Sequence, residues 1–322
     1  MERKMPKGYA VLWAVFAAAY GVWMTVFMPK YVLDNYENMP AEMLVDGKVY
    51  PNLSGMVGAH WLYPLWVVFS VAALLLFIFY LKKFLYCDTQ TKAMTVVSAI
   101  LLVAGCVFVV VYGFLGEEPF INKVKYVTAS MIGLEFPWLF RVWGVLGSAS
   151  VFVNTLYCYR KYGYNSRAGL IAGSIGAFAI FITINCPSVG SDPAPYFPRP
   201  RMLGHWAGAL IFAVGCAAPV VIFLFSTARR FKGRFAATAV VFAGLLLVML
   251  VLLVTVGKSA IIENIPMVAA YILLFLFNFT HIYDRAVSDG DGAGGRDDST
   301  TYYGCPASEK AEKLRTGKTR MK

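Results

Sequence analysis

The stretch FAATAVVFAGLLLVMLVLLVTV, residues 235–256, decides the class of this protein, because it carries no charged side chain over roughly 20 residues. At ~1.5 Å rise per residue, a helix of that length crosses the ~30 Å hydrocarbon core of a bilayer. Seven other stretches have the same character. The sequence therefore predicts an all-α, polytopic integral membrane protein with eight transmembrane helices, at residues 9–28, 61–81, 93–115, 137–158, 168–186, 206–228, 235–256 and 266–283.

The composition agrees with this prediction. Apolar residue types make up 59% of the 322 residues and charged types 15%, which is too little polarity to cover a water-soluble protein of this size. A bilayer must therefore act as much of its solvent. We expect three parts, namely two amino-terminal helices with an outer loop at 29–60 (residues 1–92), a six-helix membrane core (93–283) and a disordered cytoplasmic tail (284–322).

The positions of the basic residues predict the orientation. Of the 29 Lys and Arg residues, 21 lie in the termini and in the connections that follow every second helix, seven lie in the opposite loops, and Arg141 lies within a helix. The side richer in Lys and Arg belongs in the cytoplasm. We therefore predict that both termini are cytoplasmic and that the protein lies in the cell membrane. The net charge of +11 then suits anionic membrane lipids as partners, and not nucleic acid.

Small and polar residues within the helices predict which helices touch. Two neighbouring helices carry glycines at helical spacing, Gly169, Gly173 and Gly176 in one and Gly204, Gly208 and Gly215 at the start of the other and within it. Such stripes let helix backbones approach closely in membranes, so we predict that these two helices pack together. Asn154 and Asn278 are candidate partners for a hydrogen bond between helices.

The charged residues avoid the membrane centre. No Lys, Arg, Asp or Glu lies at the centre of a predicted helix, where insertion would cost roughly 2.5 to 3.5 kcal/mol. This weighs against a proton-coupled transporter and a voltage sensor. Candidate functional groups gather instead at the outer ends of the helices. This outer-face cluster consists of His60, Glu135, Arg141, Asp192, His205 and Glu263, with Arg199 and Arg201 nearby.

These residue types suit more than one role. Arg side chains hold phosphate groups in a bidentate fork, and His with carboxylates binds hydrolytic metals or serves as general base and acid. The chain has no compact metal-binding or nucleophile motif and its three histidines form no haem pair, so we predict no metal or other cofactor. The alternative is a set of interfacial caps and ion pairs, in which Arg141 reaches outward or pairs with Glu135 or Glu263.

Three outer segments resemble a known family. Residues 130–135, Ser-Met-Ile-Gly-Leu-Glu, precede the fourth helix, Cys186 closes the fifth before a Pro-rich loop and His205, and Glu263 precedes the eighth. Over residues 93–283 the chain resembles the six-helix membrane family that includes domain of unknown function 998 and the DRAM and FRAG proteins. The resemblance implies a six-helix core with two added helices, and a pairing of His205 with Glu263 across the outer face.

The sequence leaves three functions open. In the first, the protein binds or moves a lipid-like or small polar ligand at the outer-face cluster. In the second, it is a membrane enzyme that acts on lipid headgroups through His60, His205 and the nearby carboxylates. In the third, it is a structural or assembly protein that uses only its helix faces. We favour the first, and the sequence indicates neither the ligand nor the oligomeric state.

Overall fold

A computed structural model describes Val15, residues 42–45 and 48–51, residues 92–185 without 163 and 165, and residues 199–283. The predicted helices at 9–28 and 61–81 lie outside this part of the chain apart from Val15, and so does the predicted tail at 284–322. His60 and Asp192 of the outer-face cluster lie outside it as well.

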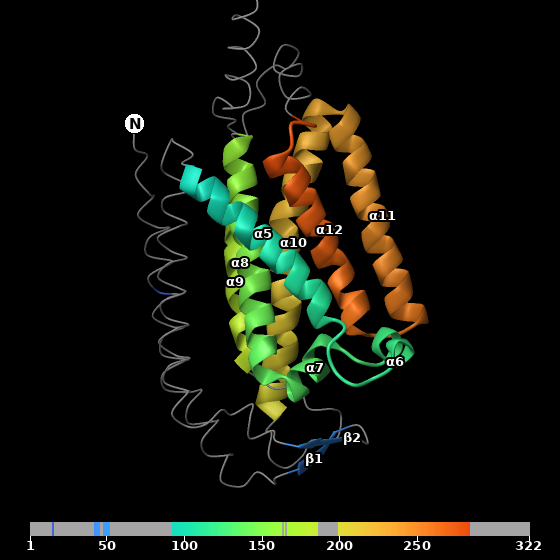
Figure 1. Cartoon of the computed structure of the whole chain (residues 1–322). Helices are drawn as coiled ribbons and strands as arrows, with labels where there is room; N and C mark the ends of the chain where they lie inside the picture. Colours follow the sequence, from blue (N-terminus) through green and yellow to red (C-terminus); the bar gives the residue numbers. More distant parts are fainter. Residues whose placement is uncertain are drawn as a thin grey trace, which may run out of the picture.

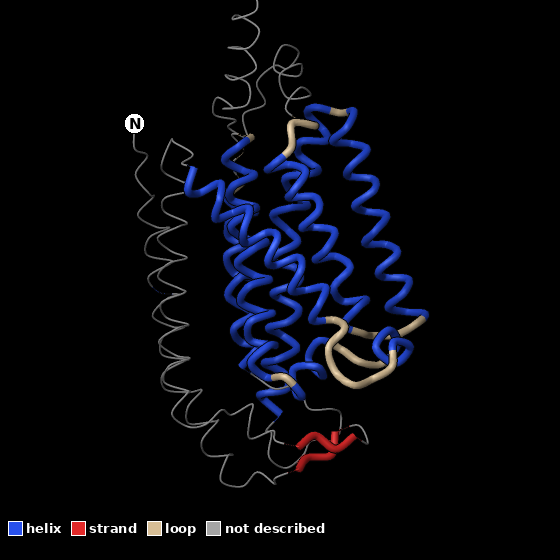
Figure 2. The backbone as a smooth tube through the Cα atoms, viewed as in Figure 1, coloured by secondary structure: helices blue, strands red, loops and turns tan. Residues whose placement is uncertain are grey.

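Six long helices form the bundle in the described part of the chain (Figure 1). They are α5 (Lys92–Tyr112), α8 (Pro137–Lys161), α9 (Arg167–Asn185), α10 (Arg199–Phe231), α11 (Gly233–Thr255) and α12 (Ala260–Phe279). The short helices α6 (Phe120–Lys125) and α7 (Ala129–Glu135) lie between α5 and α8 in the sequence. The antiparallel strands β1 (Glu42–Val45) and β2 (Lys48–Pro51) lie at the same end of the bundle as α7, and β2 contacts α7 (Figure 2).

We call this end the α7 end, and the opposite end, where Lys232 joins α10 to α11, the turn end. The helices α8, α10 and α12 begin at the α7 end, whereas α5, α9 and α11 finish there. All six are long and apolar enough to cross a membrane, over Met94–Tyr112, Leu139–Lys161, Arg167–Ile184, Gly204–Phe231, Gly233–Thr255 and Ala260–Phe279. The predicted all-α class and six of the predicted helices are thereby confirmed.

The predicted starts of two helices are wrong. The last helix begins at Ala260 and not at residue 266, because the side chain of Ser259 caps it by accepting a hydrogen bond from the backbone N–H of Ile262 at 3.3 Å. Glu263 therefore lies in the first turn of α12 and does not precede it. Similarly, α10 begins at Arg199, so His205 lies within this helix.

The glycine stripes bring α9 and α10 into close contact. A Cβ atom built on Gly176 would lie 2.6 Å from the carbonyl carbon of Gly215, and one built on Gly215 would lie 2.5 Å from the Cα of Gly176. Nearer the α7 end, a Cβ on Gly208 would lie 2.6 Å from Oγ1 of Thr183. The prediction that these two helices are neighbours is confirmed, and the fit tolerates no side chain at Gly176 or Gly215.

Asn154 of α8 links three helices. Its Nδ2 donates to the carbonyl of Ser98 in α5 at 3.1 Å. The Nδ2 of Asn278 in α12 lies 2.9 Å from the backbone oxygen of Asn154 and 3.2 Å from its Oδ1, and donates to both. All three residues are buried. The predicted hydrogen bond between Asn154 and Asn278 is confirmed, and it fixes the relative register of α8 and α12.

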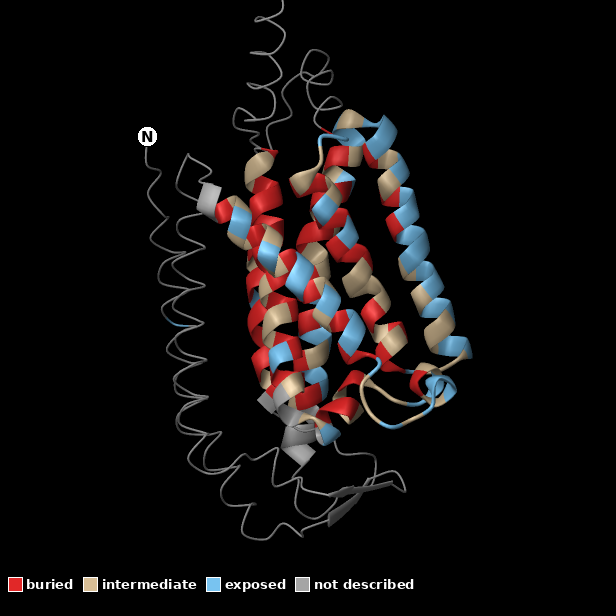
Figure 3. Cartoon of the chain, in the orientation of Figure 1, coloured by how far each residue is buried: buried red, intermediate tan, exposed pale blue. Residues whose placement is uncertain are grey.

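The helix α11 is attached mainly at the turn end. Phe235 is fully buried, with its ring 5.8 Å from that of Phe277 and 4.8 Å from that of Tyr283. From residue 243 to its last residue at the α7 end, α11 has no buried residue, and Figure 3 shows this long exposed side. The α7 half of α11 therefore packs loosely against the other helices.

Candidate functional site

A cavity of about 510 Å³ lies beside the loosely packed half of α11, among α8, α10, α11 and α12. This volume falls within the ~300 to 1,000 Å³ range of small-molecule sites in proteins. The α11 wall consists of residues at helical spacing, which therefore share one face of the helix: Phe242, Leu246, Met249 and Leu253.

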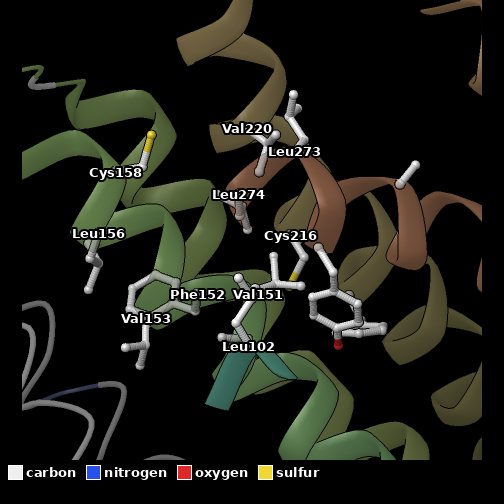
Figure 4. Close-up of a cluster of buried hydrophobic side chains, with 14 of the residues drawn as sticks. Leu102, Val151, Phe152, Val153, Leu156, Cys158, Cys216, Val220, Leu273 and Leu274 are labelled. Atoms are coloured by element: carbon white, nitrogen blue, oxygen red, sulfur yellow. The ribbon is translucent and has the colours of Figure 1, made fainter. Parts of the chain in front are cut away.

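The other walls are also apolar. The α8, α10 and α12 walls include Val151, Cys216, Val220, Met267 and Ala270. Figure 4 shows Val151, Cys216 and Val220 within one cluster of buried hydrophobic side chains. The cavity opens past α10, because Leu210 lines it and is nevertheless 66% exposed. Its greater part is therefore an apolar space that is open on one side.

Polar side chains line only the α7 end of this cavity. They are Ser130, Thr183, His205, Lys258 and Glu263, from α7, α9, α10, the α11–α12 connection and α12 respectively. Each belongs to the part of its element nearest the α7 end. The cavity is thus polar at one end and apolar along the rest of its length.

Glu263 is held by two contacts at this polar end. Its Oε2 accepts a hydrogen bond from the backbone N–H of Ala129 at 3.1 Å, and its Oε1 lies 3.5 Å from Nζ of Lys258. The carboxylate therefore joins α7 to α12 and also lines the cavity.

His205 lies on the α9 side of the same end and is 4% exposed. Its Nδ1 lies 3.0 Å from the carbonyl oxygen of Thr183. Because a carbonyl only accepts hydrogen bonds, Nδ1 carries the proton in this arrangement. The ring also stacks near Phe140, at 6.4 Å between ring centroids. These contacts fix the orientation of the imidazole.

The outer-face cluster predicted from the sequence divides in this structure. His205 and Glu263 line the cavity, but Glu263 is bound to Ala129 and Lys258 and is not paired with His205 as the family resemblance implies. Arg141 is buried in the second turn of α8 outside the cavity lining.

Glu135 is exposed and lies beside Gly116, since its Oε2 would be 3.0 Å from a Cβ built on that glycine. In the part of the chain that the structure describes, neither Glu135 nor Glu263 forms an ion pair with Arg141, and no three His, Cys, Asp or Glu side chains gather as a metal-binding group.

Sequence reasoning missed Lys258, Thr183 and Ser130. Lys258 carried a usable signal, because it is the one basic residue between the helices that end at Thr255 and begin at Ala260. Ser130 begins the outer segment 130–135 of the family resemblance, but that segment did not mark its side chain as part of a cavity. Thr183 carried no signal, since its role follows from which helices meet.

These features define an α-helical, multi-pass membrane protein with an amphipathic internal cavity. Comparison with protein families found no match for this chain, and comparisons with curated proteins and with solved structures found none either. The resemblance to the family of domain of unknown function 998 is thus a prediction that rests on the three outer segments alone.

Proposed function

We propose that this protein binds a lipid-like amphiphile in the cavity, with the polar head at the α7 end and the apolar tail along α11. The observation that carries the proposal is the division of a single cavity into a short polar end and a long apolar part. An amphiphile has the same division. A small polar ligand would fill only the α7 end.

The size of the cavity supports an occupant. The apolar lining of α10 from Ala209 to Val220 spans about 16 Å at ~1.5 Å per residue. The apolar part is therefore long enough for much of an acyl chain.

The open side of the cavity supports a ligand that comes from the bilayer. Leu210 and Trp206 line the cavity and also form part of the exposed, apolar side of α10. In a bilayer this side faces lipid tails, so an amphiphile can enter sideways without passing through water. With the orientation predicted from Lys and Arg, the α7 end faces outward and the lipid comes from the outer leaflet.

A pair of neighbouring substitutions in α11 tests the proposal. Leu246 lines the cavity, whereas Leu247 is 61% exposed and does not. We expect Leu246→Trp to fill the apolar part and to lower the binding of a lipid with a fluorescent tail at least tenfold. Leu247→Trp adds the same side chain outside the cavity and should leave binding unchanged. Binding is measured in maltoside micelles as energy transfer from the protein's Trp residues to the fluorescent tail. The Trp fluorescence of each variant without lipid serves as its reference.

Equal effects of the two variants would contradict the proposal. The purely structural alternative gives a different pattern, in which substitutions at His205 and Glu263 lower the free energy of unfolding but leave lipid binding to the folded fraction unchanged. The enzyme alternative requires that a bound lipid be converted, which mass spectrometry of the recovered lipid detects.

A further inference from the structure

The head of the bound lipid meets two opposite charges at the α7 end of the cavity. Lys258 and Glu263 both line this end, and each can contact a charged group of the ligand. We infer that the site selects a zwitterionic lipid head, with the cationic group of the head on Glu263 and its anionic group on Lys258. This inference rests on the proposed function and names the class of ligand.

The contact between Lys258 and Glu263 is loose enough to be replaced. The Nζ atom of Lys258 lies 3.5 Å from Oε1 of Glu263, whereas a strong charge-assisted hydrogen bond is about 2.7 to 2.9 Å long. The Lys258 side chain is 64% exposed, and exposed pairs of this kind contribute little to stability. Lys258 can therefore leave Glu263 and bind another anion.

The carboxylate of Glu263, in contrast, is fixed in place. Its Oε2 accepts the hydrogen bond from Ala129, and its side chain is 27% exposed. A cation that replaces Lys258 at Oε1 leaves the bond to Ala129 intact. The site thus offers a carboxyl group in a fixed position and, next to it, a positive charge on a flexible stem.

Charge balance decides which head fits. A zwitterionic head gives each protein charge an opposite partner, so no charge in the partly dry site is left without one. A head with a net negative charge would bring that charge close to the fixed carboxylate of Glu263, and a cationic head would face Lys258; both are unfavourable. An uncharged head would leave Lys258 paired with Glu263 and would gain no charge contact with either residue.

The tail cannot supply this selectivity. In a bilayer, lipid tails are as apolar as the cavity walls, so transfer of a tail into the cavity gains little. Lipids with the same tail therefore compete mainly through their heads. The apolar lining holds any single tail that fits, and Lys258 and Glu263 discriminate.

The test uses the full chain in maltoside micelles and four lipids with one fluorescent tail. Their heads are phosphocholine, phosphoglycerol, an uncharged glycerol, and trimethylammonium. We expect phosphocholine to bind at least tenfold more tightly than the other three. Lys258→Met should shift the preference to trimethylammonium, and Glu263→Gln, which retains an acceptor for Ala129, should shift it to phosphoglycerol. A merely structural role would weaken all four equally.

Control substitutions remove the same charges nearby. Lys125→Met and Glu135→Gln change exposed residues of α6 and α7 that do not line the cavity, and should leave the order of preference unchanged. Lys258→Met changes an exposed side chain, so it tests the inference even if Glu263→Gln prevents folding.

Three outcomes overturn the inference, and they can be told apart. If all four lipids bind alike and Leu246→Trp still blocks them, the selection of the head is wrong and the proposed function stands. If no lipid binds, or if Leu246→Trp has no effect, the proposed function itself fails. Free phosphocholine without a tail should not displace the lipid at an equal concentration; displacement would identify a soluble zwitterion as the ligand and would overturn the lipid assignment.

Discussion

Replacement of Gly215 by Ala should disrupt the close backbone contact between α9 and α10. The new Cβ would lie 2.5 Å from the Cα of Gly176 and 2.7 Å from the carbonyl oxygen of Ala172. Since carbon atoms pack at ~3.5 to 4.0 Å, α9 and α10 must separate by about 1 Å. Both neighbours are backbone atoms, so no side chain can turn away.

The cost follows from this separation. Overpacking costs typically 1 to 3 kcal/mol, and a gap of 0.5 to 1 Å also removes a quarter to a half of the dispersion energy of the surrounding contacts. We therefore expect Gly215→Ala to lower the free energy of unfolding by about 3 kcal/mol. Lipid binding should fall as well, because the adjacent Cys216 lines the cavity.

A matched control lies in α11. Nothing is within 4 Å of a Cβ built on Gly244, and Ala is the better helix former by ~1 kcal/mol. Gly244→Ala should therefore be neutral or stabilising by up to about 1 kcal/mol. The free energy of unfolding of both variants is measured in mixed micelles with increasing dodecyl sulfate, and unfolding is followed by Trp fluorescence. If Gly215→Ala proves as stable as Gly244→Ala, the close packing of α9 on α10 is refuted.

Other substitutions test single contacts by the same unfolding measurement. Asn278→Leu removes both hydrogen bonds to Asn154 and should lower the free energy of unfolding by about 1 to 2 kcal/mol. Asn154→Ala keeps the backbone oxygen and, of these two bonds, removes only the one to Oδ1, so in a double-mutant cycle the two losses should add except for a coupling of about 0.5 to 1 kcal/mol. A coupling of zero would argue against the contact between the two side chains. The Nζ of the buried Lys123 donates hydrogen bonds to two backbone carbonyls after α5, at 2.5 and 2.7 Å. Lys123→Met removes both and should lower the free energy of unfolding by about 1.5 to 3 kcal/mol. The control Lys125→Met should leave the free energy of unfolding unchanged. Gly257→Ala forces Ala to adopt a φ near +104° and should lower the free energy of unfolding by about 1 to 2 kcal/mol. An unchanged free energy of unfolding would show that this turn relaxes to accept Ala.

Some of the fold could be predicted because the signals are local. A run of apolar residues such as 235–256 is long enough to span a bilayer whatever its neighbours are, so composition alone finds the helix. The contact of Gly176 with Gly215 was predictable for a related reason, since only glycine allows backbones to approach so closely. Asn154 and Asn278 were predictable as partners because a buried amide in a membrane helix needs one.

The start of α12 shows where a local signal gives the wrong answer. Pro266 resembles the first residue of a helix, because proline lacks the N–H group that is unsatisfied there. In the structure this proline lies inside α12, and the helix starts at the cap formed by Ser259. Packing of neighbouring helices stabilises such an internal proline in membrane proteins, and the sequence of one helix does not reveal that packing.

The sequence by itself determined the membrane class, the existence and order of the six described helices and the residues that bring α9 next to α10, because each follows from the length of an apolar run or from one residue type. Only the tertiary structure decided that Glu263 pairs with Lys258, that His205 lies against Thr183, and that a cavity lies between the α7 half of α11 and the other helices. A cavity is the space that several helices leave between them. It depends on all their positions and orientations at once, so no single segment of the sequence encodes it.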